Sequence, residues 1–384
     1  MRAKHKVRVG LERDAPLCIS RPHTEWVSSG AGYFTSKFLI SEESIKHLSP
    51  GVIESLKSIT VNSGKPFTIA DYGCADGGTS MPLMYACVKE LRDLYGNELE
   101  IQINYEDRPE NDYNSIFYFL QGLLPHSSSY VLDFPNVFVS ASGTSFYEQC
   151  FPSESVNLGF SCLAIQWLRK KPCNLTKAVL CCFSEVQSER DMFTKQAEKD
   201  WEEFLLVRAK ELAKGGRLAV ILPCHSGGEI ESSPSVQVIY KLLYNVWESM
   251  EKDKIISKKE VEEMTIPEYF RTHEEMMEPF ISDASPVRKA GLNLVSIEYK
   301  EFSLPEKAMW QVAGNAKACV RLMTEQTRAW SNSRFQSALG DHHSAKEKSA
   351  ILDEFFYRLE EQALLSPEEY MTVIKNAFII IEKS

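Results

Sequence analysis

Apolar residues along this chain follow two spacings, one typical of short buried β-strands and one typical of helices. Helical spacing appears first at 36–59, where Pro50-Gly51 predicts a break. It returns at 81–94, 114–124 and 192–214. The last of these helices is expected to end at Gly215-Gly216, because glycine commonly terminates helices. Between the helices, strands are predicted at 67–72, 100–105, 136–140, 156–163 and 217–222.

The alternation of strand and helix predicts an α/β fold with a mainly parallel sheet, covered by helices on both faces. Residues 223–290 interrupt this pattern with Met-rich, acidic sequence, in which helices are expected at 236–250, 258–264 and 273–281. Strands at 291–302 and 372–381 are typical of late antiparallel strands that close such a sheet. The stretch 305–365 between them is predicted to be helical, with a polar break at 340–343.

Composition narrows the class of protein. The chain has 384 residues, enough for one large domain with an insertion or for two domains. Its net charge of -10 argues against nucleic-acid binding, which depends on Lys and Arg side chains that neutralise phosphates. No apolar run approaches the roughly 20 residues that span a bilayer, and the N-terminus lacks an apolar signal segment. The ten cysteines form no C-x-x-C pair, and we interpret them as free thiols of a cytoplasmic protein.

The most informative segment is a strand that runs into a glycine-rich turn, Ile69-Ala70-Asp71-Tyr72-Gly73-Cys74-Ala75-Asp76-Gly77-Gly78. Glycine in such a turn lets the adenosyl portion of a ligand lie against the backbone, where a Cβ would displace it. The spacing differs from the G-x-G-x-x-G of dinucleotide sites, and Asp71 would repel a pyrophosphate. For the glycines alone, a tight turn without a ligand is the alternative.

Acidic residues at two strand ends favour a ligand that carries positive charge. S-adenosylmethionine carries an ammonium and a sulfonium, which Asp71 would attract. Glu106 or Asp107 follows at the end of the next strand, where a carboxylate accepts hydrogen bonds from both ribose hydroxyls. The sequence therefore predicts S-adenosylmethionine as cofactor and S-adenosylhomocysteine as its product. An oxidoreductase and a non-catalytic binding protein are the alternatives from other classes, and the glycine spacing argues against the first.

The segment Ile69-Ala70-Asp71-Tyr72-Gly73-Cys74 resembles the I-A-D-L-G-C signature of the SABATH methyltransferases, which methylate carboxyl groups of small acids and ring nitrogens. Further motifs are similar in the same order: Asp107-Arg108-Pro109-Glu110-Asn111-Asp112-Tyr113-Asn114, Ser145-Phe146-Tyr147 with Phe151-Pro152, Gln166-Trp167-Leu168, and Ile266-Pro267-Glu268-Tyr269. The resemblance implies a Rossmann-like methyltransferase fold, with a mainly parallel seven-stranded sheet and an inserted helical cap, often as a homodimer.

The resemblance also implies a division of the chain. An N-terminal arm with helices that contribute to the active site occupies 1–60, and the cofactor-binding core occupies 61–222. The helical cap is expected at 223–290. Residues 291–384 supply the closing strands, with further cap helices at 305–365.

Individual residues acquire expected roles from the resemblance. The cofactor-binding residues are Asp71, Gly73 and Thr79 on the methionine side, Asp107 and Arg108 at the ribose, and Ser145 and Phe146 at the adenine. The substrate-binding residues are Ile40, Leu163, Trp167, Tyr240 and Tyr370. Trp167 and Gln166 are the predicted catalytic residues, which orient the acceptor while Tyr240 and the cap exclude water. No general base is needed, because a carboxylate acceptor is already ionised at neutral pH.

Departures from the family pattern leave the acceptor open. The family's carboxylate-binding Gln falls near Ile40, and its H-S-S-Y-S-L stretch is Phe160-Ser161-Cys162-Leu163-Ala164-Ile165 here. We expect methyl transfer to the carboxylate of a small organic acid. The alternatives are N-methylation of a small molecule and a relative that binds ligands without catalysis.

Metal and histidine chemistry are not expected at the site. The residues that hold magnesium in some family members are replaced around 262–265, and we predict no metal. The pair His342-His343 is expected in a solvated loop, and His225 is a candidate for substrate contact. The expected partners are a small-molecule substrate and a second copy of the chain, with no nucleic acid and no membrane.

Overall fold

The computed structural model describes residues 31–62, 64–125, 128–224, 234–303, 310–311, 314–370 and 373–384. The candidate substrate contact His225 lies outside these residues. Within them, no helix is long and apolar enough to cross a membrane.

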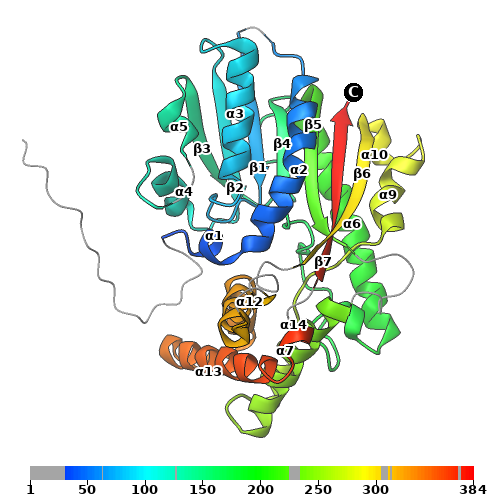
Figure 1. The fold of residues 1–384 in the computed structure, drawn as a ribbon. Helices are drawn as coiled ribbons and strands as arrows, with labels where there is room; N and C mark the ends of the chain where they lie inside the picture. Colours follow the sequence, from blue (N-terminus) through cyan, green and yellow to red (C-terminus); the bar gives the residue numbers. More distant parts are fainter. Residues whose placement is uncertain are drawn as a thin grey trace, which may run out of the picture.

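A seven-stranded sheet forms the centre of the molecule (Figure 1). Its strands are β1 (Phe67–Tyr72), β2 (Ile101–Asp107), β3 (Val137–Gly143), β4 (Val156–Cys162), β5 (Leu212–Pro223), β6 (Leu292–Ser303) and β7 (Val373–Lys383). They lie in the order β3-β2-β1-β4-β5-β7-β6. The first five pair in parallel, and β7 pairs antiparallel with both β5 and β6. The predicted mainly parallel sheet with late antiparallel strands is therefore confirmed.

Helices surround the sheet and form a separate layer beyond one end of it. The elements are α1 (Tyr33–Lys37), α2 (Leu39–Lys57), α3 (Met81–Tyr95), α4 (Tyr113–Leu120), α5 (Tyr130–Asp133), η1 (Cys181–Phe183), α6 (Gln187–Glu211), α7 (Pro234–Lys252), α8 (Lys258–Glu263), α9 (His273–Ile281), α10 (Pro286–Lys289), α12 (Ala316–Ala338), α13 (Ala345–Ala363) and α14 (Pro367–Tyr370).

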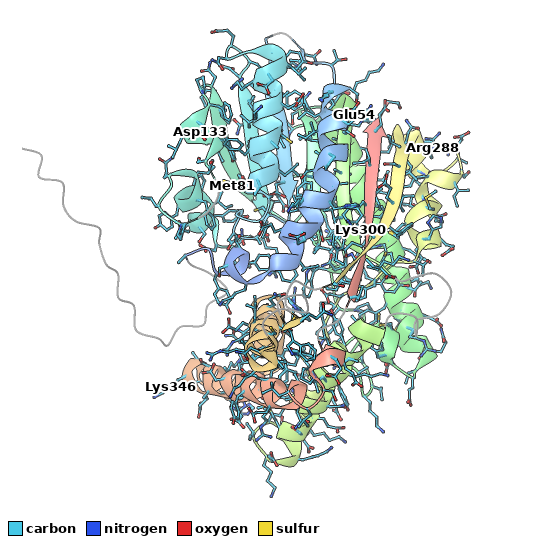
Figure 2. The ribbon with its side chains drawn as sticks, in the orientation of Figure 1. Glu54, Met81, Asp133, Arg288, Lys300 and Lys346 are labelled. Atoms are coloured by element: carbon cyan, nitrogen blue, oxygen red, sulfur yellow. The ribbon has the colours of Figure 1, made fainter. Side chains whose placement is uncertain are left out.

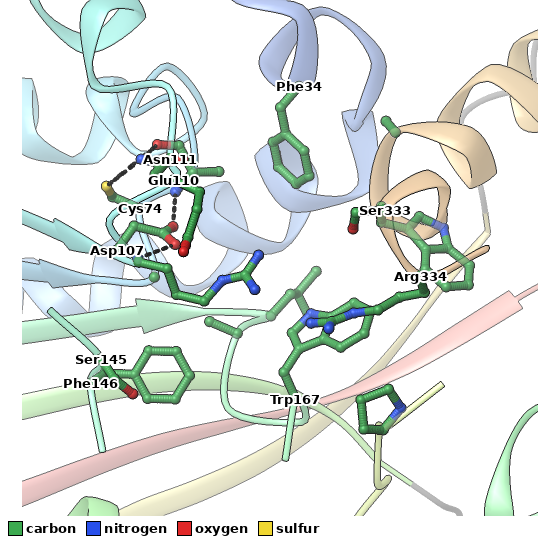
Figure 3. A pocket seen from close by; sticks show the side chains of 18 of the residues that line it. Phe34, Cys74, Asp107, Glu110, Asn111, Ser145, Phe146, Trp167, Ser333 and Arg334 are labelled. Carbon is green, nitrogen blue, oxygen red and sulfur yellow. Dashed lines mark hydrogen bonds between the residues drawn. The ribbon is translucent and has the colours of Figure 1, made fainter. Parts of the chain in front are cut away.

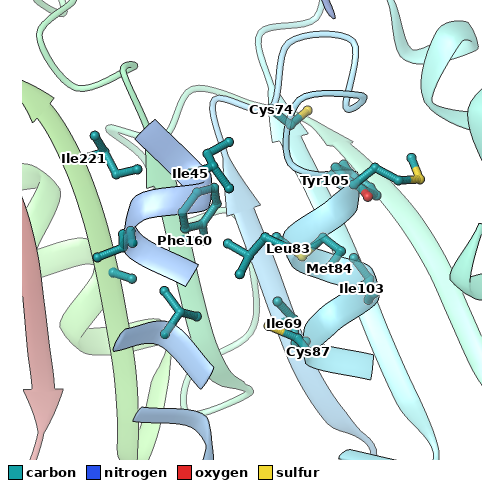
Figure 4. Close-up of a cluster of buried hydrophobic side chains, with 14 of the residues drawn as sticks. Ile45, Ile69, Cys74, Leu83, Met84, Cys87, Ile103, Tyr105, Phe160 and Ile221 are labelled. Atoms are coloured by element: carbon teal, nitrogen blue, oxygen red, sulfur yellow. The ribbon is translucent and has the colours of Figure 1, made fainter. Parts of the chain in front are cut away.

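Both faces of the central strands β1 and β4 are buried, and successive residues of each strand point to opposite sides of the sheet. Ile69 belongs to the core beneath α2 and α3 (Figure 4), whereas the neighbouring Ala70 belongs to the core beneath α6. Burial on both faces is typical of parallel strands that are covered by helices on each side.

The cap has a core of its own, built by α7, α8, α12 and α13 around Trp247, Phe335 and Phe355. It lies beyond the carboxyl ends of the parallel strands (Figure 1). The helices α9 and α10 fall within the stretch 223–290 that the sequence assigns to the cap. They pack instead against α6 and β6, on the face of the sheet. Charged side chains such as Glu54 on α2 and Lys346 on α13 cover the outer surface (Figure 2).

Two predicted boundaries are wrong, and packing explains both. The helix α2 continues through Pro50, because Ile45, Leu48, Val52 and Leu56 form one buried stripe that crosses the proline. The helix α6 ends at Glu211 rather than at Gly215-Gly216. Leu212 already pairs with Val156 of β4, and the glycines lie in a register shift within β5.

Candidate active site

The carboxyl ends of β1, β2 and β4 open into a cavity of about 820 Å³ (Figure 3). Strands β1 and β4 are neighbours, but α3 and α6, which follow them, lie on opposite faces of the sheet. Such a switch in topology leaves a crevice where ligands bind in open α/β sheets. The helices α1 and α2 line one side of the cavity, and α12 of the cap lines the other.

The glycine turn after β1 lines the cavity and packs closely against the turn after β4. Gly73 has φ of +75°, and a Cβ there would collide with the Cβ of Ala164. Ala75 also has positive φ, at +49°. Its N–H donates to the Asp107 carboxylate (2.8 Å), and its carbonyl accepts from the Asn111 amide (2.6 Å). The strained backbone is thus held by two side chains that follow β2.

Asp71 ends β1 with a side chain that lines the cavity and is only 2% exposed. It accepts a hydrogen bond from Ser80 at the start of α3 (2.5 Å). Burial raises the pKa of the Asp71 carboxyl to about 7, although the Ser80 hydrogen bond opposes the shift. A cation placed beside this carboxyl would favour its ionised form.

The structure distinguishes between the two acids at the end of β2. Asp107 lines the cavity, whereas Glu106 is fully buried and hydrogen-bonds the backbone N–H of Gly73 (3.2 Å). Burial raises the pKa of Glu106 to about 9 and also raises the pKa of Asp107. Asp107 is therefore the acid that faces a ligand, and Glu106 supports the turn from behind.

Asp76 is a lining residue that the sequence analysis missed. It is 3% exposed and accepts hydrogen bonds from the N–H (2.9 Å) and the hydroxyl of Thr35 on α1. The glycine turn thereby holds the N-terminal helix against the cavity. Position 78 requires glycine for the same reason, since a Cβ there would collide with Thr35.

Ser145 and Phe146 line the cavity after β3, and a buried ion pair holds their segment in place. Arg208 on α6 donates to the carbonyls of Phe146 (2.9 Å) and Glu148 (2.8 Å). Its guanidinium pairs with Glu211 (2.9 Å), and both side chains are fully buried. This support was not predicted, because Arg208 lies far along the chain from the motif that it stabilises.

The turn after β4 brings Leu163 and Trp167 to the cavity. Leu163 has φ of +49°, which is uncommon for a branched residue and marks local strain. The side-chain amide of Gln166 donates to the Leu163 carbonyl (2.7 Å) and so holds this conformation. Across the cavity, Trp330 and Arg334 project from α12, and the Arg334 guanidinium lies 4.8 Å from the centre of the Trp167 ring (Figure 3).

Comparison with known proteins agrees with this geometry. Residues 37–384 match the family described as SAM dependent carboxyl methyltransferase. The chain belongs to this family. It is 23% identical over 275 residues to anthranilate O-methyltransferase 1 of Zea mays, covering 66% of this chain and 72% of that protein. Loganic acid O-methyltransferase of Catharanthus roseus is 25% identical over 224 residues, covering 55% and 57% of the two chains.

A solved structure shares the fold. Loganic acid methyltransferase with SAH superposes with a TM-score of 0.73 at 18% identity, covering 93% of this chain and 98% of the other. The predicted Rossmann-like fold is confirmed by this likeness, and the predicted SABATH membership by the family match. The methyltransferase uses S-adenosylmethionine as its methyl donor.

The residues at the turn fit that cofactor. Gly73 lines the cavity and lets the turn pack directly against Ala164, and the nearby buried Asp71 suits a cationic group. Asp107 presents the one carboxylate of the β2 end that reaches the cavity. The cavity also gathers the other predicted cofactor-binding residues, Thr79, Arg108, Ser145 and Phe146.

Four predicted residues of the methyltransferase do not line the cavity formed by the described residues. Ile40 is 1% exposed in the core under α2, and Gln166 is buried against the Leu163 backbone. Tyr240 donates to Glu268 (2.5 Å) and packs behind Trp330, and Tyr370 is buried beside Thr324 and Thr327. The sequence assigned them by position along the motif pattern, but helix packing directs these side chains into the interior.

The histidine pair differs in part from its prediction. His342 is exposed, as expected for a solvated loop, but the His343 side chain is only 15% exposed. Both rings lie near the Glu260 carboxylate, with His343 Nε2 at 3.0 Å, and these three groups have a spacing that could hold a metal ion. Glu260 already accepts hydrogen bonds from the N–H groups of Ser257 and Gly340, and the cluster does not line the cavity.

Proposed function

We propose that this methyltransferase converts the carboxylate of a small organic acid into its methyl ester. The observation that supports it most directly is the division of the cavity. Asp71 and Asp107 line the cavity where β1 and β2 end, and Trp330 and Arg334 line it from the cap helix α12. Bound S-adenosylmethionine supplies an electrophilic methyl group, whose bond to sulfur breaks as a bond to the acceptor oxygen forms, leaving a neutral thioether.

The residues of the chain bind and position rather than transfer protons. The described part of the cavity lining contains no histidine, and an ionised carboxylate needs no base to become a nucleophile. Holding two reactants in line can contribute roughly 7–11 kcal/mol to lowering the barrier. Trp167 is placed to orient the acceptor, because its side chain lines the cavity at the turn after β4. Gln166 acts indirectly, by holding the Leu163 turn.

The relatives favour a carboxylate over a ring nitrogen. Those named above carry anthranilate and loganic acid in their names, and both compounds are carboxylic acids. A related Zea mays protein is named inactive anthranilate O-methyltransferase 1, so the test must also detect loss of catalysis.

The test is a panel of carboxylic acids and heterocyclic amines incubated with a donor that carries a labelled methyl group. Methyl esters release labelled methanol in mild alkali, whereas N-methyl groups keep their label. We expect alkali-labile label with at least one acid and none with the amines. Alkali-stable label would contradict the proposal in favour of N-methylation. Absence of transfer to every acceptor, with donor binding retained, would favour a non-catalytic relative.

We also propose that the enzyme is a cytoplasmic homodimer. The cysteines of the described segments are all free thiols, as in a reducing compartment. Large apolar side chains are exposed on the adjoining elements α4, α5 and β3, namely Phe117, Tyr118, Leu132 and Phe138. Light scattering after gel filtration should give twice the chain mass, and a monomer for the Phe138→Ser variant. A monomeric wild type would contradict the dimer.

A further inference from the structure

Arg334 presents a charged group to the cavity, and Glu268 interacts with this charge without forming an ion pair with it in the described part of the chain. Within the described segments, its guanidinium has no hydrogen bond and no ion pair, and its recorded contact is the face of Trp167. Two other basic residues of the lining have protein partners. Arg169 pairs with Glu148 and Glu203, and Lys171 donates to the carbonyl of Glu263.

A second guanidinium approaches the same space. Arg108 follows β2 and lines the cavity, and no side-chain partner is recorded for it among the described residues. Burial lowers the pKa of Arg334, the positive charge of Arg108 lowers it further, and Glu268 acts in the opposite direction. Arginine nevertheless stays protonated in proteins. Two facing cations repel, so an anion bound between them would lower the energy of the site.

The positions expected to bind a carboxylate cannot do so. The family's amide falls near Ile40, which is apolar and 1% exposed within the core. Leu163 occupies the position of the motif's tyrosine and offers no side-chain donor. Gln166, the amide that was predicted to orient the acceptor, donates to the Leu163 carbonyl instead. Of the predicted acceptor contacts, Leu163 and Trp167 line the cavity, and only Trp167 carries a polar side-chain group.

We propose that Arg334, stacked on Trp167 and assisted by Arg108, binds the carboxylate of the acceptor. Recognition has thereby moved from an uncharged amide near the N-terminus to a guanidinium on the cap helix α12. The acceptor class is an anionic acid with an apolar or aromatic body, which Phe34, Trp167 and Trp330 would contact. This inference rests on the proposed function for its identification of the acceptor.

The guanidinium acts on binding more than on the chemical step. It stabilises the carboxylate before transfer, and this attraction weakens as the ester loses its charge. An interaction that is strongest in the ground state lowers KM without raising kcat. It also favours release of the ester, and it rejects neutral and cationic acceptors.

The experiment compares 2-naphthoate with its neutral isostere 2-naphthamide as probes of binding, in the presence of saturating S-adenosylhomocysteine. Wild type should bind the acid at least about tenfold more tightly than the amide, as expected for a charge-assisted hydrogen bond. Arg334→Gln should abolish this preference and leave S-adenosylhomocysteine binding unchanged, which also shows that the variant is folded. Arg334→Lys should restore part of the preference.

The matched control is Arg321→Gln, on the same helix but exposed and paired with Glu325. It should keep the full preference. A wild type without a preference, or an Arg334→Gln variant that retains it, would overturn the inference. Ester formation by Arg334→Gln with unchanged KM would overturn it while leaving the proposed function intact. An Arg334-dependent preference without methyl transfer would instead contradict the proposed function alone.

Discussion

The hydroxyl of Ser80 lies 2.5 Å from the Asp71 carboxylate and donates a hydrogen bond to it at the junction of β1 and α3. The two residues are thereby fixed relative to the glycine turn. The pair leaves one carboxylate oxygen of Asp71 for a ligand in the cavity. This relationship makes Asp71 the best single residue through which to test cofactor binding.

Replacing Asp71 with Asn should weaken S-adenosylhomocysteine binding. The substitution keeps the shape but removes the negative charge that attracts the ligand's ammonium. A hydrogen bond to a charged group contributes about 1.5–3 kcal/mol, which corresponds to roughly 10- to 100-fold in Kd. Isothermal titration measures the change. Asp133→Asn, which alters a carboxylate at the end of α5 remote from the cavity lining, is the control. Equal affinities for Asp71→Asn and wild type would remove Asp71 from the site.

Cofactor affinity should depend on pH through Asp71. Its pKa in the ligand-free protein is raised to about 7, and a bound cation favours the ionised form. Binding therefore releases a proton below this pH. The Kd for S-adenosylhomocysteine should fall by about tenfold per pH unit up to pH 7 and then level off.

The Ser80 hydrogen bond opposes the rise in the pKa of Asp71, so Ser80→Ala should move the midpoint of this pH profile to higher pH.

The stability of the ligand-free protein should also depend on pH through these carboxyl groups. Because the folded-state pKa values of Asp71 and Glu106 are raised, their contribution is full at low pH and is lost as pH rises through about 7 and about 9. Thermal unfolding measured across this pH range should therefore show a melting temperature that falls as pH rises. A Kd for S-adenosylhomocysteine that did not change with pH would contradict the role of Asp71.

Gly73→Ala should damage both folding and cofactor binding. Alanine at positive φ costs about 1–2 kcal/mol, and here its Cβ would also collide with Ala164. Gly64→Ala is the matched control, because Gly64 has φ of +83° with open space around it. Denaturant unfolding should show a larger loss for Gly73→Ala than for Gly64→Ala. Only the former should weaken S-adenosylhomocysteine binding, and equal behaviour of both variants would refute the steric argument.

Breaking the Arg208–Glu211 ion pair should destabilise the fold. Arg208→Met leaves a fully buried carboxylate without its cation, which costs about 3–5 kcal/mol. The double variant Arg208→Met/Glu211→Gln should recover part of this loss. It should still bind S-adenosylhomocysteine less tightly than wild type, because the Phe146 carbonyl has lost its donor. Lys89→Met, in an exposed pair with Asp93, should leave the unfolding curve unchanged. A single variant as stable as wild type would contradict this account.

Local patterns in the sequence were sufficient to predict the sheet and the glycine turn after β1. Strands such as 67–72 are short and buried on both faces, and Asp71 stands two residues before the first glycine of the turn. Both features are formed by residues that are close together in the sequence, so the sequence alone predicts them. The continuation of α2 through Pro50 was not predicted, because the buried stripe formed with the sheet outweighs the local signal of the proline.

The residues on the proposed acceptor side of the cavity were harder to predict, because contacts between segments far apart in the sequence bring them together. Arg334 meets Trp167 only because the cap helix α12 returns over the turn after β4. Its spacing of four residues from Trp330 places both on one helix face, which is the available local signal. Tyr240 and Tyr370 matched expected positions, yet their hydroxyls bond in the interior to Glu268 and to Thr324 of α12. Position in a motif therefore predicted membership of the cavity lining better for the expected cofactor residues than for the expected acceptor residues.

The most direct measurement is a calorimetric titration of the purified wild-type protein with S-adenosylhomocysteine, with NAD titrated in parallel. The account predicts saturable heat at one site per chain for S-adenosylhomocysteine and none for NAD. Heat with NAD, or no heat with S-adenosylhomocysteine, would contradict the claim that acids at two neighbouring strand ends bind the methyl donor.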